Sequence, residues 1–159
     1  MKKFLIQFVL LLTVIFGATF IYQGKSLPFS FQLQQLPKSQ QVIIGDTKVN
    51  VEIADTKDER SKGLGGKESL ASDSGMLFIF DRQDFYSFWM KGLKFPLGFI
   101  WIRGDKVVDI TENVPVPSEG AKDEDLPIYQ SKEPIDKLLE VNGGFVIQNG
   151  IKIGDTFNR

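Results

Sequence analysis

The chain has 159 residues and a formal charge of −1 at pH 7, and it contains neither cysteine nor histidine. These absences exclude disulfides, thiolate nucleophiles, iron–sulfur clusters, the usual zinc sites and histidine-dependent triads, and they leave carboxylate chemistry, a lysine-assisted nucleophile or a hard cation bound by oxygen. The length accommodates one domain with an appendage, and the lack of excess Lys and Arg argues against nucleic acid as a partner.

The N-terminal segment predicts a membrane anchor. Residues 4–22 form an almost uninterrupted apolar run that two lysines precede. A helix needs roughly 20 apolar residues to cross a bilayer, and the flanking lysines favour a cytoplasmic N-terminus with an extracytoplasmic body. A cleaved signal peptide is the alternative, but its apolar core is normally about 7–15 residues long and ends in small residues, whereas bulky residues follow Ala18. We therefore assign residues 1–23 to a single-pass anchor, with secretion after cleavage as the alternative.

A tether and a hairpin follow the anchor. Residues 24–41 are rich in glutamine and are interrupted by Pro28 and Pro37, which is typical of a linker. Order is expected from residue 42, so the domain is assigned to residues 42–159. Residues 42–53 alternate apolar and polar side chains on either side of a Gly-Asp turn, a pattern that predicts two antiparallel strands.

The next segment predicts a short helix. Thr56 and Glu59 have the spacing of a capping box, so a helix is expected over residues 57–62, ended by Gly63. The glycine-rich loop 63–66 is too short, and its spacing is wrong, for a phosphate-binding loop, which favours a simple turn. Beyond it, the continuous apolar run over residues 76–80 predicts a buried strand.

An aromatic stretch with both tryptophans occupies the middle of the chain. Residues 85–91 and 95–102 read as two apolar strands joined by a short connection, at the centre of the β core. A turn then leads to a further strand over residues 106–110, which completes a hairpin. Trp89 and Trp101 are expected in the core rather than on a ligand platform, because an indole buries a large area and needs one partner for its N–H group.

The C-terminal part predicts a loop followed by short elements. Residues 113–130 carry three prolines and the acidic cluster 123–125, which lacks the alternating ligands of a calcium site and is assigned to a solvated loop. Residues 135–141 predict a strand, residues 145–148 a helical turn or short strand, and an extended piece reaches Phe157. The elements together predict a mainly β domain with one or two short helices.

Five motifs resemble those of the prokaryotic domain of unknown function 192 family. In chain order they are Glu68-Ser69-Leu70, residues 75–80, Phe88-Trp89-Met90-Lys91 followed by Phe95-Pro96-Leu97, Leu139-Glu140-Val141-Asn142, and residues 150–155. The resemblance covers roughly residues 48–157. It implies a compact β sandwich or barrel-like single domain, often behind a signal peptide or anchor, and it implies no established reaction.

One position departs from the family pattern. After Pro-Leu the family usually has an aspartate, and this chain has Gly98. Any function that this aspartate carries in relatives is therefore lost or moved here.

The polar residues within the motifs supply the candidate ligand site. Lys91 either ends a strand with its stem on aromatic surface or places a cation at the mouth of a concave site for an anionic or carbonyl ligand. Glu68 and Glu140 either pair with Lys91 or Arg60, or act in acid–base chemistry if burial raises one pKa. No catalytic residue, metal or cofactor is assigned. The candidate ligand-binding residues are Lys91, Trp89, Glu68, Glu140 and Asn142.

Two classes of function remain. The first is a binding or accessory module, anchored outside the membrane, that holds a small ligand, a glycan or a protein partner. The second is a hydrolase-like enzyme that uses carboxylates with Lys91. We favour the first hypothesis, because the chain has no histidine, cysteine or paired-acid motif and its polar residues are scattered.

Overall fold

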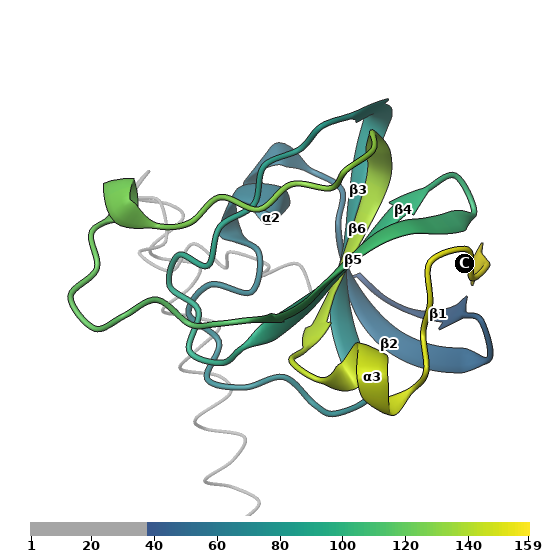
Figure 1. Cartoon of the computed structure of the whole chain (residues 1–159), viewed down its shortest axis with the longest axis horizontal. Helices are drawn as coiled ribbons and strands as arrows, with labels where there is room; N and C mark the ends of the chain where they lie inside the picture. The colour runs from purple at the N-terminus through teal and green to yellow at the C-terminus, as the bar shows by residue number, and fades with distance from the viewer. Residues whose placement is uncertain (1–37) are drawn as a thin grey trace, which may run out of the picture. The chain divides into compact units, whose positions relative to one another are not determined.

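The computed structural model describes residues 38–159, which form one strongly curled sheet of seven strands with two short α-helices (Figure 1). The predicted anchor over residues 1–23 and all but the end of the predicted linker lie outside the described residues. No helix within residues 38–159 is long and apolar enough to cross a membrane.

The elements follow the chain with few long gaps. They are β1 (Ser39–Ile44), β2 (Thr47–Ala54), α2 (Lys57–Lys62), β3 (Ser74–Asp84), β4 (Leu97–Arg103), β5 (Lys106–Val114), the 3-10 turn η1 (Asp123–Asp125), β6 (Ile135–Asn142), α3 (Phe145–Gln148) and β7 (Phe157–Asn158). The sheet order is β5-β4-β6-β3-β2-β1-β7. The predicted mainly β fold with short helices is thus confirmed, and β1 begins three residues before the expected start of the domain.

The sheet closes on itself at one end. The two outermost strands of the sheet order are β5 and β7, yet residues 154–157, which lead into β7, hydrogen-bond to residues 105–107 around the start of β5. Gly154 N–H donates to the Val107 carbonyl at 2.8 Å, and Phe157 N–H donates to the Asp105 carbonyl at 2.8 Å. The fold is therefore a single curled, half-barrel sheet rather than a sandwich of two sheets.

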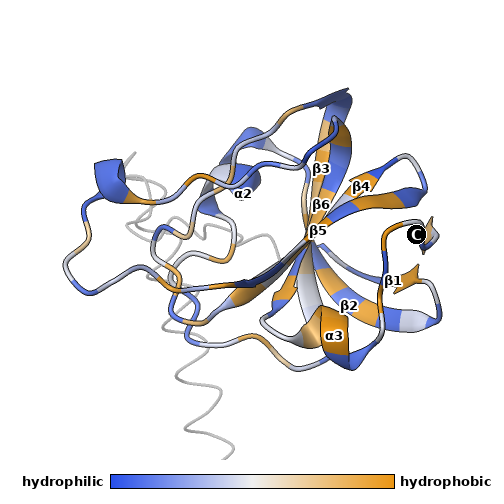
Figure 2. Cartoon of the chain, in the orientation of Figure 1, coloured by the Kyte–Doolittle hydropathy of each residue, from blue (hydrophilic) through white to orange (hydrophobic). Residues whose placement is uncertain are grey.

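Each face of the sheet carries its own apolar core. The first core takes residues from nearly every strand, including Val107 of β5 and Phe157 of β7, so it lies inside the curl. The short helix α3 is hydrophobic (Figure 2) and buries Phe145 and Val146 in this first core. The second core covers the other face and is built from Ala54, Leu64, Met76, Phe78, Met90, Leu97, Phe99, Trp101, Val114, Ile135 and Leu138. Because both faces are covered, β4 is apolar along almost its whole length.

The aromatic stretch differs from its prediction. Residues 85–91 form no strand of the sheet, and Phe88 alone makes a bridge, to Tyr129, with backbone hydrogen bonds of 2.9 and 2.8 Å. The segment instead crosses the second core, with Phe88 packed edge-on against Phe78 and Trp101. Trp89 points away from this core and is 45% exposed, so its predicted burial is wrong.

The other tryptophan is buried as predicted. Trp101 of β4 is fully buried, and its indole N–H donates to the Thr111 hydroxyl at 2.9 Å, which supplies the partner that a buried indole needs. The predicted hairpins β1–β2 and β4–β5 are confirmed as antiparallel pairs. In contrast, β2 and β3 are parallel, and the connection that contains α2 joins them across the second core.

Candidate functional site

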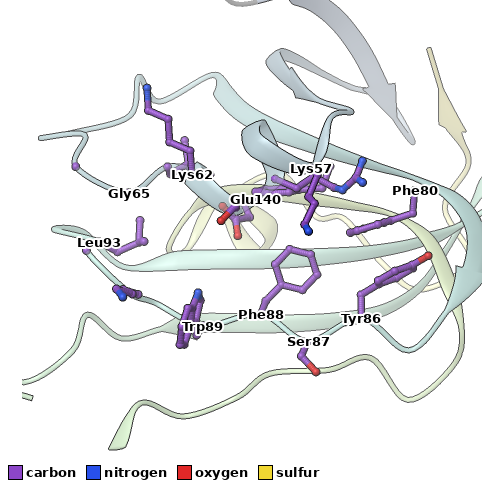
Figure 3. A pocket seen from close by; sticks show the side chains of 18 residues that line it. Lys57, Lys62, Gly65, Phe80, Tyr86, Ser87, Phe88, Trp89, Leu93 and Glu140 are labelled. Atoms are coloured by element: carbon purple, nitrogen blue, oxygen red, sulfur yellow. The ribbon is translucent and has the colours of Figure 1, made fainter. Parts of the chain in front are cut away.

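A pocket of about 670 Å³ lies between α2 with its glycine loop and the aromatic segment that follows β3 (Figure 3). This volume is typical of small-molecule sites, which run from roughly 300 to 1,000 Å³. We call it the α2 pocket; its lining consists of residues 57, 60–66, 78, 80, 86–89, 91–93 and 140.

The predicted capping box fixes the helix that forms one wall. Glu59 N–H donates to the Thr56 hydroxyl at 3.2 Å, and Thr56 N–H donates back to the Glu59 carboxylate at 2.9 Å. The Thr56 hydrogen bonds, together with one from the Asp55 N–H, lower the pKa of Glu59 to about 2. The helix start is therefore rigidly defined, which presents Lys57 and Arg60 to the pocket.

We expect Thr56→Ala to lower the free energy of unfolding by about 1 kcal/mol, because the Glu59 amide loses its acceptor at the helix start. Urea unfolding of the full-length chain measures this change. Thr56→Ser keeps the hydroxyl and serves as the matched control, with an expected loss of only a few tenths of a kcal/mol. Equal losses in the two variants would show that the hydroxyl contributes nothing.

The helix ends in a loop that only glycine can form. Gly63 has a φ of 51°, in the left-handed region, and a Cβ atom there would lie 3.3 Å from the Phe78 ring. Further along the loop, Gly66 N–H donates to the Gly92 carbonyl at 3.0 Å, so the two walls of the pocket touch at this end. The loop therefore serves as a turn that draws α2 onto the aromatic segment.

Arg60 attaches the helix to the sheet. Its Nη1 donates to the backbone carbonyls of Asp55 at 2.5 Å and Ile79 at 2.9 Å. The guanidinium carbon also lies 5.2 Å from the centre of the Phe80 ring, a distance that allows a cation–π contact. Within residues 38–159 no carboxylate pairs with Arg60, so its positive charge remains unneutralised beside the pocket.

Aromatic side chains form the opposite wall. Phe80 and Tyr86 are stacked with ring centroids 3.6 Å apart, and Phe88 meets Phe78 edge-on at 5.3 Å. Trp89 lies at the rim, where the Lys91 ammonium is 5.3 Å from the indole centre. Flat rings of this kind bury the apolar body of a ligand and favour stacking on planar groups.

Glu140 projects from β6 into this pocket. In the sheet it lies between Met76 of β3 and Phe99 of β4, on the side of the second core. Its carboxyl oxygens point into the space between the side chains of α2 and those of the aromatic wall (Figure 3). Only 5% of the residue is exposed, and burial raises the pKa of Glu140 to about 8. At neutral pH the side chain is therefore mainly an uncharged carboxylic acid.

This carboxyl group lacks a partner in the protein. Across residues 38–159 no hydrogen bond or salt bridge reaches the Glu140 side chain, and desolvation alone accounts for the shift in its pKa. Buried polar side chains nearly always have a hydrogen-bond partner. A buried, unpartnered acid that faces a pocket is accordingly the strongest sign of a ligand site in this domain.

The structure gathers three of the five candidate residues at the pocket. Trp89, Lys91 and Glu140 line it, and Lys91 also forms an ion pair with Asp123. Glu68 lies outside the lining and pairs with Lys94. Asn142 donates from Nδ2 to the Leu70 and Ala71 carbonyls at 3.1 and 3.0 Å, so its amide holds the loop before β3.

Sequence reasoning considered Arg60 only as an ion-pair partner and missed Lys57 and Lys62 as groups of the site. Helical spacing puts Lys57, Arg60 and Ser61 on one face, which was a usable signal once the helix was predicted. This spacing alone could not identify the site, because only the tertiary structure shows that the same face of α2 and Glu140 line one pocket. Among residues 38–159 no group of three or more acidic, histidine or cysteine side chains could hold a metal ion.

The departure at Gly98 does not affect the α2 pocket. Gly98 pairs with Val141, whose side chain belongs to the first core, so the position faces the side of the sheet opposite to Glu140. A Cβ atom at Gly98 would meet Val141 and Val146 at 3.4 and 3.6 Å, which is ordinary contact. A side chain at position 98 of this chain would lie on the face of the sheet opposite to Glu140.

Two solved structures are similar to this chain. A Sinorhizobium meliloti protein, described as a "putative transcription regulator", matches with 29% identity and a TM-score of 0.68 over 77% of this chain and 94% of its own. A protein of unknown function from Novosphingobium aromaticivorans matches with 27% identity and a TM-score of 0.70 over 84% and 94%. A search of curated proteins finds no match.

The family assignment rests on most of the domain. The model of the domain of unknown function 192 family, described as "Uncharacterized ACR, COG1430", matches residues 40–158, which include every motif quoted above. This range is nearly the whole of the curled sheet and both walls of the α2 pocket. The chain belongs to the domain of unknown function 192 family.

Proposed function

We propose that this domain is a binding module that holds a small organic anion in the α2 pocket. The observation that carries the proposal is the unpartnered carboxyl group of Glu140 at the base of a pocket with aromatic walls. A ligand in the pocket would give the Glu140 carboxyl group a hydrogen-bond partner, and a hydrogen bond of this kind contributes about 0.5–1.5 kcal/mol.

The charges of the lining favour an anion. Lys57, Arg60, Lys62 and Lys91 border the pocket, and within the described chain only Lys91 has a carboxylate partner. Glu140 is the single acidic residue of the lining and is mainly uncharged at neutral pH because of its raised pKa. The net positive potential attracts anions and raises their local concentration at the entrance.

A binding role fits the geometry better than the hydrolase-like alternative. A carboxylate pair needs two acids close together, yet the lining has Glu140 alone, and Glu68 pairs with Lys94 outside it. The aromatic walls, with a few charged and polar side chains around them, resemble the usual composition of ligand pockets, in which polar groups orient the ligand.

We also propose that residues 1–23 anchor the protein in a membrane with the domain on the extracytoplasmic side. The apolar run 4–22 and the two lysines before it support this orientation. Protease treatment of spheroplasts tests it: the domain should be degraded while the cells stay intact. Protection of the domain until the cells are lysed would contradict the proposed orientation.

The binding proposal is tested by calorimetry on the full-length chain in a mild detergent, against a panel of small aromatic and sugar-derived anions. We expect the double variant Lys57→Ala/Lys62→Ala to weaken binding roughly tenfold at low salt, since two unpaired charges leave the rim. Lys48→Ala/Lys152→Ala removes the same charge away from the pocket and should bind like the wild type. Equal effects of the two double variants, or no binding by any anion, would contradict the proposal.

A further inference from the structure

We propose that the group recognised by Glu140 is a carboxylate, so that the α2 pocket takes up a ring-bearing monocarboxylic acid with one proton shared between the ligand and Glu140. This inference rests on the proposed function and specifies its ligand. It follows from the geometry around Glu140, from the state of the neighbouring charges and from the donors that the pocket offers.

The carboxyl group of Glu140 is the polar group at the base of the pocket. Glu140 lies between Met76 and Phe99 in the sheet, and the pocket surface near it is formed by Leu64, Phe78 and Phe88. In such surroundings an ionised Glu140 beside an anionic ligand would place two negative charges in contact in a medium of low dielectric constant. A protonated Glu140 donates its O–H to the ligand instead, and a carboxyl–carboxylate hydrogen bond of this kind is charge-assisted and short.

The other charged groups around Glu140 are consistent with a protonated acid. The lining contributes Lys57, Arg60 and Lys62 from α2, and Tyr86 and Lys91 from the aromatic wall. The next acidic residue in the same cross-strand row of the sheet is Glu52, opposite Met76 of β3, and its carboxylate is neutralised by the Lys67 ammonium at 2.7 Å. Burial alone accounts for the raised pKa of Glu140.

The available donors favour a carboxylate over a phosphate. A phosphate group carries three acceptor oxygens and up to two charges, and proteins usually bind it through a bidentate arginine or several backbone N–H groups. In the α2 pocket Nη1 of Arg60 is already occupied by two backbone carbonyls, so Arg60 is poorly placed to hold a phosphate with both arms of its guanidinium. The lysines of the lining attract either anion, and the single O–H of Glu140 matches one oxygen of a carboxylate.

The aromatic wall specifies the rest of the ligand. The stacked pair of Phe80 and Tyr86 and the half-exposed indole of Trp89 present flat apolar surfaces above the base. A planar aromatic ring or the apolar face of a sugar ring buries well against such surfaces. The ligand class is therefore an aromatic carboxylate or a uronic acid, and the two are separated by the probes below.

The test is isothermal titration calorimetry of the full-length chain at pH 6.5, 7.5, 8.5 and 9.5. The probes are 2-naphthoate and glucuronate, with the carboxamide of each and phenyl phosphate as controls. We expect one carboxylate to bind at least tenfold more tightly than its amide and than phenyl phosphate. Above pH 8 its affinity should fall by up to about tenfold per pH unit, because the binding form of Glu140 must be protonated.

Glu140→Gln separates this inference from the proposed function. The glutamine amide can donate a hydrogen bond in place of the carboxyl O–H but does not titrate. We expect the variant to lose the decline in affinity above pH 8, since its side chain no longer titrates. Lys57→Ala serves as the matched control: it should bind more weakly but keep the decline.

The possible results lead to different conclusions. If an organic anion binds equally well from pH 6.5 to 9.5, or if Glu140→Gln keeps the wild-type decline, the proton-linked inference is overturned while the proposed anion binding stands. Preference for phenyl phosphate over both carboxylates overturns the assigned ligand class alone. If none of the probes and no anion of the panel binds, both the inference and the proposed function fail.

Discussion

As the pH rises from 5 to 9, the free energy of unfolding of Glu140→Gln is expected to increase by about 4 kcal/mol relative to that of the wild type. In the unfolded chain Glu140 has a pKa near 4.5, whereas burial raises its pKa to about 8 in the folded domain. Between these values the unfolded state holds fewer protons than the folded state, so the stability of the wild type falls as the pH rises. Glutamine stays uncharged at every pH and avoids this loss.

Urea unfolding of both full-length proteins at pH 5, 7 and 9 measures this difference. Near pH 5 the two should be similar, and at pH 9 the variant should unfold at a clearly higher urea concentration. Glu119→Gln removes an exposed carboxylate and is the matched control, whose difference from the wild type should not change with pH. A constant difference for Glu140→Gln at all three pH values would falsify the assignment of a buried acid that is uncharged at neutral pH.

Gly75→Ala is expected to cost about 3 kcal/mol, the upper end of the usual range for an extra group in a packed core. A Cβ atom at Gly75 would lie 2.6 Å from the Glu140 carbonyl oxygen and 2.9 Å from a methyl carbon of Leu139. Gly75 belongs to β3, which is paired on both sides, with Val51 of β2 and Val141 of β6. Neither neighbour can move away without breaking ladder hydrogen bonds, so the strain cannot relax cheaply.

Gly98→Ala is the matched control for this prediction. Gly98 is also a buried strand glycine, but its added Cβ atom would have neighbours no closer than 3.4 Å. Alanine there reduces the freedom of the unfolded chain and fits the folded one, so the stability should stay the same or rise by up to about 1 kcal/mol. Thermal unfolding of both variants measures these two changes in stability. Similar losses in the two would mean that close approach at Gly75 is not what requires glycine.

Gly75 and Gly98 both pair with Val141 on the first-core side of the sheet, yet they differ in the space that a side chain would have. At Gly75 the close approach is to the backbone of Glu140 itself, so a side chain there would displace the residue at the base of the α2 pocket. Gly98 faces the first core and has room for a methyl group. The pocket therefore depends on a glycine within a family motif, whereas the position that departs from the family pattern lies away from it.

Local interactions were readable from the sequence because they join residues that are close along the chain. The capping box of Thr56 and Glu59 predicted the start of α2, and Gly63 its end. The alternating pattern on either side of the Gly-Asp turn predicted the β1–β2 hairpin, and the turn residues between two strand-like runs predicted the β4–β5 hairpin. Hydrogen bonds between near neighbours need no information about the rest of the fold, so the residue types alone determine them.

The prediction of a strand over residues 85–91 was wrong because strand pairing depends on residues that are far apart in the sequence. Residues 85–91 have the composition of a strand, but β3 and β4 on either side of them are not neighbours in the sheet. β6 lies between these two strands, although it begins 32 residues after β4 ends. With no edge to pair with, the segment covers the second core, where Phe88 packs inward and Trp89 faces the solvent.

The residues of the candidate site, too, were predictable from the sequence only in part. The sequence by itself determined the family, the mainly β fold, the short helix, and Glu140 as a candidate acid at the edge of an apolar strand. The membrane anchor over residues 1–23 stays a prediction. Only the tertiary structure decided that Glu140 lies opposite Lys57 and Arg60, because insertion of β6 beside β3 brings together groups about 80 residues apart. Burial by that packing, which no local pattern encodes, turns an ordinary glutamate into an uncharged acid without a protein partner.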